Sequence, residues 1–432
     1  MGQCPYGFAS SDENPGLESA VDGPRPSEWS PALDETFGSA HRDYAELRRT
    51  NPFPWSEDFG GFWAATSYED IVRITQDDEL FITSVQNVVP HVPRSSRRPP
   101  LHFDPPEHTA YREAIDPVLR RSTVRAHESA FRESAGELVQ GLLAKNDGAD
   151  GVRDFAAPFV MDCFASFLGV SSSLTRHIRE IGVRYSFAIQ DMDEGVIGEY
   201  SAELYRIAEE VYRDRLAAGA DSAQDLVSSL HEAALNPENH ITEKTAIATI
   251  RQMIVAGMGA PQAVLSSCLV HLAQDQDLQQ HLRSNPKDLP AAIEEFLRLH
   301  APYRVFARTA KQDTLVHGRM VREGDPIALI FPSGNRDETV FPDPDEFVLR
   351  RPNNSHLAFG RGAHKCPAAT LGRMELLIAL EVLLENTDRF DLAGDVVMMN
   401  WLEYGPRAVP LRLIGKTAAG AARVPKPRTV GQ

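Results

Sequence analysis

The segment LAFGRGAHKC, residues 357–366, places one cysteine at the end of a stretch with two glycines. Gly360 and Gly362 let the backbone turn tightly and approach another group closely. The following residues, PAATLGRMELL, have a helical pattern, so Cys366 is expected just before a helix N-terminus. Backbone N–H groups there favour a thiolate, which is a nucleophile or a metal ligand. The alternative is a buried structural cysteine, the commonest role of a lone thiol.

Composition narrows the class of protein. The chain has 432 residues, 42% of them hydrophobic, and a formal net charge of −17, which disfavours nonspecific nucleic-acid binding. The four cysteines are far apart and form no CxxC pair, so neither a disulfide framework nor a zinc site is expected. The N-terminus lacks a signal-peptide pattern, and no apolar run reaches the ~18 residues of a membrane span. We therefore expect a cytoplasmic protein without membrane contact.

Apolar spacing predicts a mainly α-helical chain with a minor β portion. Helical patterns dominate residues 122–235 and return at 242–270, 288–299 and 370–387. Short β-rich runs broken by Gly and Asp-Pro lie in the first and last hundred residues. We expect a flexible N-terminal arm over 1–30, a single domain over 31–415 and a disordered basic tail over 416–432.

The cysteine segment resembles a known signature. FGRGAHKCPA is similar to the haem-binding segment of the cytochromes P450, with matches at Phe359, Gly360, Gly362, His364, Cys366 and Ala368. The resemblance covers residues 31–415 and lies with the soluble, bacterial-type members. It implies the cytochrome P450 fold, a triangular helical domain around a buried haem b, with Cys366 as the axial ligand of the haem iron.

Charged residues elsewhere fit the same family. Glu295 and Arg298 resemble its ExxR pair, which shares one helix face at i and i+3. Arg351 resembles the arginine that joins this pair as the third member of a structural cluster in the family. Two haem propionates in an apolar interior need charge-assisted partners. The resemblance implies that the propionate partners are His108, Arg112, Arg308 and His364. It also implies that the loop below the haem contacts the cofactor through Phe359 and Gly360.

The distal helix departs from the family. Where the family has Ala-Gly-x-acid-Thr-Thr, this chain has AGMGAP, with Gly259 at the acid position and Ala260 at the first threonine position. Pro261 has no N–H and clashes with the carbonyl four residues back, so we expect a kink between residues 257 and 261. The alternative is that the helix ends at Pro261. The candidate catalytic positions are Ala256, Gly257, Gly259, Ala260, Pro261 and Gln262.

The missing acid and alcohol leave several reactions open. A monooxygenase could receive protons through ordered water, the substrate or Gln262. A peroxygenase would use hydrogen peroxide directly, although this chain lacks the arginine that precedes the proline in the fatty-acid branch. A one-electron oxidation, such as C–C or C–O coupling, depends less on a proton relay. Alternatives of other classes are a haem-binding protein without turnover and a cysteine-nucleophile hydrolase, which would leave the charged residues unexplained.

The resemblance also implies a substrate and an electron source. We expect a small-to-medium natural product, oxidised by a monomeric enzyme that receives electrons from NAD(P)H through a ferredoxin reductase and a ferredoxin. Arg361 and Lys365 lie on the outward-facing cysteine side, where an acidic ferredoxin would dock. Arg304 could anchor a carboxylate, or it could form a salt bridge away from the pocket. The expected substrate-facing residues are Val88, Val89, Val92, Arg304, Phe306 and Leu402.

Overall fold

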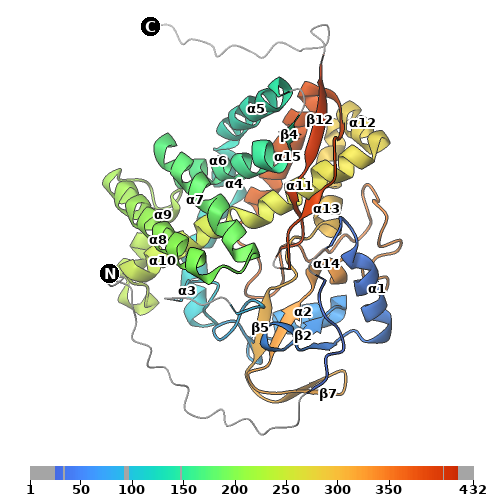
Figure 1. The fold of residues 1–432 in the computed structure, drawn as a ribbon. Helices are drawn as coiled ribbons and strands as arrows, with labels where there is room; N and C mark the ends of the chain where they lie inside the picture. Colours follow the sequence, from blue (N-terminus) through green and yellow to red (C-terminus); the bar gives the residue numbers. More distant parts are fainter. Residues whose placement is uncertain (1–24, 33–34, 92–96, 146–147, 402, 417–432) are drawn as a thin grey trace.

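The computed structural model describes residues 25–32, 35–91, 97–145, 148–401 and 403–416, and most of them are helical (Figure 1). The α-helices are α1 (Ala40–Thr50), α2 (Tyr68–Gln76), α3 (Glu107–Ile115), α4 (Arg121–Arg125), α5 (Glu128–Ala144), α6 (Ala157–Leu168), α7 (Ser172–Gln190), α8 (Glu194–Ala217), α9 (Leu226–Leu235), α10 (Glu243–Ala256), α11 (Gly259–Gln274), α12 (Gln276–Ser284), α13 (Leu289–Leu299), α14 (Phe331–Gly334) and α15 (Ala369–Asn386). The predicted α-rich fold is confirmed.

The strands form a minor part of the fold, as the sequence predicted. They are β1 (Trp55–Ser56), β2 (Phe62–Ala65), β3 (Phe81–Ile82), β4 (Ala149–Asp150), β5 (Ala307–Ala310), β6 (Thr314–Val316), β7 (Arg319–Val321), β8 (Pro326–Leu329), β9 (Thr387–Leu392), β10 (Val397–Met398), β11 (Pro406–Ala408) and β12 (Pro410–Gly415). The largest sheet has the order β1-β2-β8-β5-β3, in which only β2 and β8 pair in parallel. It lies beside α1 and α2, apart from the helical region (Figure 1).

The two helices α10 and α11 run through the helical region (Figure 1). Thr242 caps α10 by accepting from the Thr245 N–H, while the Thr245 hydroxyl accepts from the Thr242 N–H. By length and composition alone the stretch Glu243–Gln274 could cross a membrane, but 72% of its most apolar window is buried inside the protein. Surrounding helices therefore take up its apolar surface.

The expected kink is present as a break at Gly257 and Met258. Pro261 lies in the first turn of α11, where its missing N–H costs no internal helix bond. The alternative that the helix ends at Pro261 is therefore wrong. A Cβ on Gly257 would lie 2.6 Å from the ring of Phe164 in α6, so glycine is required for this packing.

The predicted N-terminal arm extends too far along the chain. Residues 1–24 and 417–432 lie outside the described residues, but residues 25–30 pack on the domain. The Trp29 ring lies 5.9 Å from the Trp401 ring, and Glu28 forms a 2.6 Å ion pair with Arg319. The boundary at residue 30 is corrected for this reason: an aromatic side chain and paired charges hold the segment.

Candidate functional site

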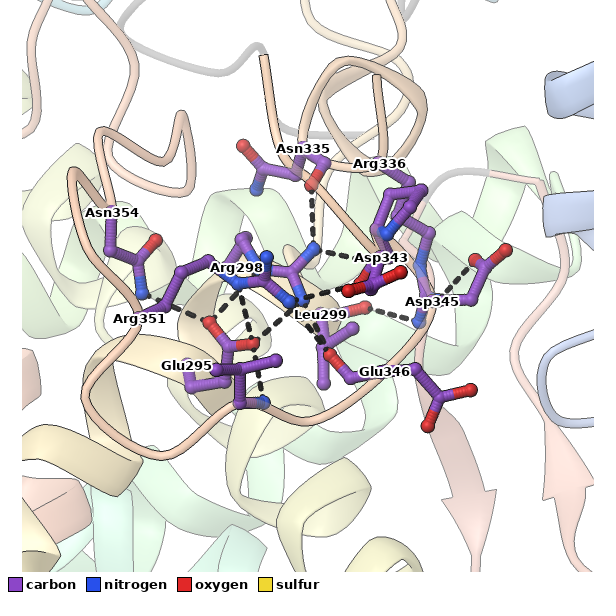
Figure 2. A network of polar contacts seen from close by, with 12 residues as sticks. Glu295, Arg298, Leu299, Asn335, Arg336, Asp343, Asp345, Glu346, Arg351 and Asn354 are labelled. Atoms are coloured by element: carbon purple, nitrogen blue, oxygen red, sulfur yellow. Dashed lines mark hydrogen bonds and ion pairs between the residues drawn. The ribbon is translucent and has the colours of Figure 1, made fainter. Parts of the chain in front are cut away.

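A buried polar network surrounds Glu295 of α13 (Figure 2). Arg298 donates through Nε and Nη2 to the two Glu295 oxygens at 2.9 and 2.7 Å. Arg351 donates through Nε to Glu295 Oε1 at 2.9 Å. Both arginines also donate to backbone carbonyls of residues 335–346. The network therefore fixes the segment that leads into the cysteine loop against α13.

The charge of Glu295 depends on these partners. The side chains of Glu295 and Arg298 are 0% exposed and that of Arg351 is 3% exposed. Burial by itself raises the pKa of Glu295, but hydrogen bonds from Arg298 and from the Val348 N–H lower it below the ordinary value. The structure thus brings together the three residues that the sequence predicted as a structural cluster, in a form that keeps the carboxylate ionised.

The cysteine loop has the tight geometry expected from its glycines. Gly360 and Gly362 have φ values of 67° and 68°, a left-handed conformation that glycine adopts without strain. A side chain on Gly362 would collide with the carbonyl oxygen of Thr75. The Cys366 N–H donates to the Phe359 carbonyl at 2.8 Å and closes the loop. The close approach of Thr75 and the hydrogen bond inside the loop therefore both fix the conformation of the loop.

The Cys366 thiol lies deeper than the sequence suggested. Burial raises its pKa, and a hydrogen bond from the Ala368 N–H and the charge of Arg112 offset this only in part. The expectation that the helix N-terminus alone would favour a thiolate is therefore wrong, because desolvation outweighs it. A bound cation would offset the cost of burial and favour the thiolate at this position.

Four predicted haem contacts converge beside this loop. The rings of His108 and His364 lie 4.4 Å apart, and His108 Nε2 is buried without a hydrogen-bond partner among the described residues. Burial lowers the pKa of His364 to about 2, with further lowering by the charges of Arg308, His108 and Arg112. Burial also lowers the pKa of Arg308 to about 10. Groups able to carry positive charge therefore meet in a buried place that favours an anion.

Arg112 has more partners than the sequence indicated. Its Nε and Nη2 donate to the Asp116 carboxylate at 2.8 and 3.0 Å. Its Nη1 donates to the carbonyls of Ala363 and Lys365, both at 2.8 Å. Arg112 thus supports the cysteine loop directly, and its contact with a propionate stays a prediction.

Small residues at the helix break keep part of their surface accessible. Ala256 is exposed and Ala260 and Pro261 are half-buried, although the helices around them are mostly buried, and Gln262 is itself buried. Cys366 also keeps part of its surface accessible, although burial dominates its pKa.

Burial raises the pKa of Tyr303, and the charges of Glu403 and Cys366 raise it further. Because the Glu403 carboxylate lies against Gly259, the helix break and the cysteine loop lie near the same residue. We call the region between them the internal space, with the cysteine loop and the helix break as its two walls.

The structure adds Glu403, which the sequence analysis did not identify. A Cβ on Gly259 would lie 2.9 Å from Cδ of Glu403 and would collide with Oε1. Glu403 also pairs through the backbone with Tyr303, whose pKa is raised first by burial and then by the charges of Glu403 and Cys366. A carboxylate from the C-terminal segment therefore lies at the position where α11 has a glycine. Only the absence of a side chain at Gly259 could have indicated this.

Glu375 of α15 was also missed. Its side chain is almost fully buried, and burial raises its pKa to about 8. Its charge affects both Cys366 and Cys163, so it lies behind the cysteine loop. The sequence shows only an acidic residue within a helical pattern, which is usually a solvated position.

The expected substrate-facing residues have different surroundings. Val88 and Phe306 are half-buried and form a backbone bridge, whereas Val89 is 1% exposed and its carbonyl accepts from Trp401 Nε1. Val92 and Leu402 lie outside the described residues. Arg304 forms a buried 2.5 Å ion pair with Glu35 and donates to the carbonyls of Trp401 and Asn400. This is the salt-bridge alternative for Arg304, and a substrate anchor there would have to break it.

Comparison with known proteins decides the family. The Cytochrome P450 family model matches residues 194–393, a span that includes Glu295 and Cys366. Mycinamicin IV hydroxylase/epoxidase of Micromonospora griseorubida is 31% identical over 387 residues, which cover 85% of this chain and 94% of the relative. The chain is a cytochrome P450. Nocardicin C N-oxygenase of Nocardia uniformis subsp. tsuyamanensis is 29% identical to this cytochrome P450, and the matched region covers 86% of this chain and 94% of the relative.

Solved cytochrome P450 structures agree with the fold. The LnmA hydroxylase of the leinamycin pathway of Streptomyces atroolivaceus has a TM-score of 0.75 at 29% identity, covering 89% of this chain and 98% of that chain. Another relative, linalool 8-monooxygenase of Pseudomonas putida, is 28% identical and covers 82% of this cytochrome P450 and 90% of the relative. The protein is therefore a monooxygenase of this family and carries haem b.

The residues present fit haem b. The propionates are anions that suit the cluster of His108, Arg308 and His364, including the His108 Nε2 that has no partner among the described residues. The iron is a cation that would offset the cost of burying a Cys366 thiolate.

Proposed function

We propose that this cytochrome P450 oxidises a small-to-medium natural product, with Cys366 as the axial ligand of the haem iron. The observation that carries this proposal is the buried cluster of His108, Arg308 and His364 beside the loop that holds Cys366. Bound there, the haem supplies oxygen activation, which a thiolate ligand favours by donating electron density. His108, Arg112, Arg308 and His364 bind the propionates, and Phe359 and Gly360 form the loop below the ring.

The substrate class rests on relatives. The names of similar proteins include a mycinamicin IV hydroxylase/epoxidase and a nocardicin C N-oxygenase, and the LnmA hydroxylase belongs to a leinamycin biosynthetic pathway. We infer a product of secondary metabolism as the substrate of this chain as well. Val88 and Phe306 contact it from the half-buried bridge that they form.

Protons reach the site without an acid on α11. Ordered water, the substrate or Gln262 were the routes expected from the sequence. Gln262 is buried and its amide cannot supply protons as an acid, so it acts by orienting water. Glu403 is a carboxylic acid of this region that can release and take up a proton, and its carboxylate lies against Gly259. We infer that Glu403 exchanges protons with water in the internal space.

Electrons come from NAD(P)H through a ferredoxin reductase and a ferredoxin, and the enzyme acts as a cytoplasmic monomer. The cysteine side carries the exposed Lys365, together with Arg361, which donates to the Ser355 carbonyl at 2.9 Å. The protein as a whole is acidic, so these positive groups form a local surface that suits an acidic ferredoxin.

The test compares two oxidant supplies with one set of candidate substrates. Candidates are first selected by the shift they cause in the Soret band of the purified holoprotein. Turnover is then measured with NADPH, ferredoxin reductase, ferredoxin and O2, and separately with hydrogen peroxide alone. We expect product from the first mixture. Product from peroxide alone, with none from the reductase system, would instead assign a peroxygenase.

A further inference from the structure

Arg251 of α10 is a fully buried cation in an unusual setting. Its side chain is 0% exposed, and its Nη2 donates to the Tyr185 hydroxyl at 2.8 Å and the Ser201 hydroxyl at 3.2 Å. The guanidinium also lies 5.0 and 5.6 Å from the ring centres of Tyr185 and Tyr205. These contacts come from α7 and α8, so the group is enclosed by three helices.

The hydrogen-bonding capacity of Arg251 is only partly used. Its Nε and Nη1 are buried and have no acceptor among the residues that the structure describes. Within the same part of the chain, no carboxylate forms an ion pair with it. Burying a charged group with unmet donors is costly unless an anion completes the site. The groups that accept from Arg251 are a phenol and a serine hydroxyl, and neither is a carboxylate that would balance the charge.

A second arginine faces the same place. Burial by itself raises the pKa of Tyr185, but the charges of Arg251 and Arg98 together lower it below the ordinary value. Arg98 also lowers the pKa of Arg251, next after burial. Two guanidinium groups, from α10 and from the segment before α3, therefore act on one phenol. Their mutual repulsion is another cost that a bound anion would remove.

The site lies close to the break in the distal helices. Tyr185 is three residues from Gly182 on α7, and a Cβ on Gly182 would lie 3.2 Å from Cε of Met258 at the break. Along α10, Arg251 precedes Ala256 by five residues, which is roughly 7.5 Å at the helical rise. Arg251 is therefore separated from the helix break by less than two helical turns.

We propose that Arg251 and Arg98, with the hydroxyl groups of Tyr185 and Ser201, bind a carboxylate of the substrate. The oxidised atom lies at the other end of the molecule, toward Ala256, which is roughly 7.5 Å farther along α10 than Arg251 by the helical rise. This inference rests on the proposed function, since it names the class of substrate that the enzyme takes. It replaces Arg304, whose guanidinium is bonded to Glu35 and to backbone carbonyls.

The test titrates the holoprotein with decanoate and with decanamide, its neutral counterpart, and reads both the Soret shift and the thermal midpoint. We expect decanoate to bind at least about tenfold more tightly, because a charge-assisted hydrogen bond is lost in the amide. Arg251→Gln should abolish this preference while leaving decanamide binding within about twofold. Arg98→Gln, at a half-buried position, should reduce the preference without the folding risk of a core change.

The matched control is Arg184→Gln, which removes an exposed guanidinium from α7 that pairs with Glu180. It should keep the full preference for decanoate. Equal binding of decanoate and decanamide by the unchanged protein would overturn the inference. So would a preference that survives in both Arg251→Gln and Arg98→Gln. A holoprotein without a thiolate–haem spectrum would instead count against the proposed function, so the two failures are distinguishable.

Discussion

The two walls of the internal space are built in different ways. The cysteine wall is local: Phe359, Gly360, His364 and Cys366 lie within one short loop, supported by the network of Glu295. The helix-break wall is assembled from distant parts of the chain, with Gly259 from α11 and Glu403 from the C-terminal segment. A local motif therefore identifies most of the residues that we propose to hold the cofactor. It is a poor guide to the chemistry on the opposite face.

The largest expected effect comes from breaking the support of the cysteine wall. Glu295→Gln removes the charge that two buried arginines share, and breaking a buried ion pair typically costs about 3–5 kcal/mol. We expect strongly reduced haem content and a matching loss of stability in urea unfolding. Glu46→Gln in α1 is the control, because its pair with Arg49 is exposed to solvent and should contribute little. Equal losses in both variants would refute the special role of the buried network.

The second effect tests whether the cysteine wall contains a neutral acid. The pKa of Glu375 is raised to about 8, so the unfolded chain ionises before the folded one as pH rises above about 4.5. The stability that the protonated Glu375 side chain contributes is thus fully present below pH 4.5 and is lost as the pH rises toward 8. The change that Glu375→Gln causes in the free energy of unfolding should therefore be more favourable at pH 7 than at pH 4.5, by roughly 3 kcal/mol. Urea unfolding across this range measures it, and a pH-independent difference would contradict the raised pKa.

The third effect concerns the helix-break wall. Glu403→Gln keeps the size of the side chain but removes its proton exchange, so we expect product formation to fall about 10- to 100-fold. The solvent isotope effect on turnover should rise, and the C–O stretch of the reduced, CO-bound protein should shift because a nearby charge is lost.

A relocated carboxylate sharpens this test. Gly259→Asp alone would collide with Glu403, whereas Glu403→Ala makes room for it. The double variant should therefore be more active than either single variant. If Glu403→Gln retained full activity and an unchanged C–O stretch, proton delivery through this carboxylate would be refuted.

The smallest effect is expected at the surface of the cysteine wall. Lys365→Glu reverses an exposed charge and should slow reduction by ferredoxin about 3- to 10-fold at low salt, with the difference fading as ionic strength rises. Lys311→Glu, at an exposed turn between β5 and β6, is the control. Equal slowing by both variants would mean that net charge, and not this surface, sets the rate.

The sequence predicted the helical architecture and the cysteine wall well, for physical reasons. Apolar periodicity located the long helices, Thr242 marked the start of α10, and Pro261 indicated the disturbance near the break. Glu295 and Arg298 are close in sequence, so their proximity on one helix face follows from helical spacing. The N-terminal boundary was placed too late, because a contact such as Trp29 with Trp401 joins residues that are distant in sequence.

The groups that were missed share one property: their role depends on tertiary contacts. Glu403, Glu375 and Arg251 are ordinary residues in their local patterns, and only burial or a distant neighbour distinguishes them. The thiol pKa of Cys366 was also misjudged, since a helix N-terminus is visible in sequence but desolvation is not. For Arg304, the sequence left two alternatives that only the position of Glu35 could separate.

The central claim is that Cys366 binds the haem iron as a thiolate, and the absorption spectrum of the reduced, CO-bound protein tests it most directly. We predict the red-shifted Soret band that gives the family its name in the unchanged protein. Cys366→Ala should lose it, while Cys163→Ala and Cys268→Ala, at buried thiols, should keep it. The absence of this band from the unchanged holoprotein, or its persistence in Cys366→Ala, would contradict the account.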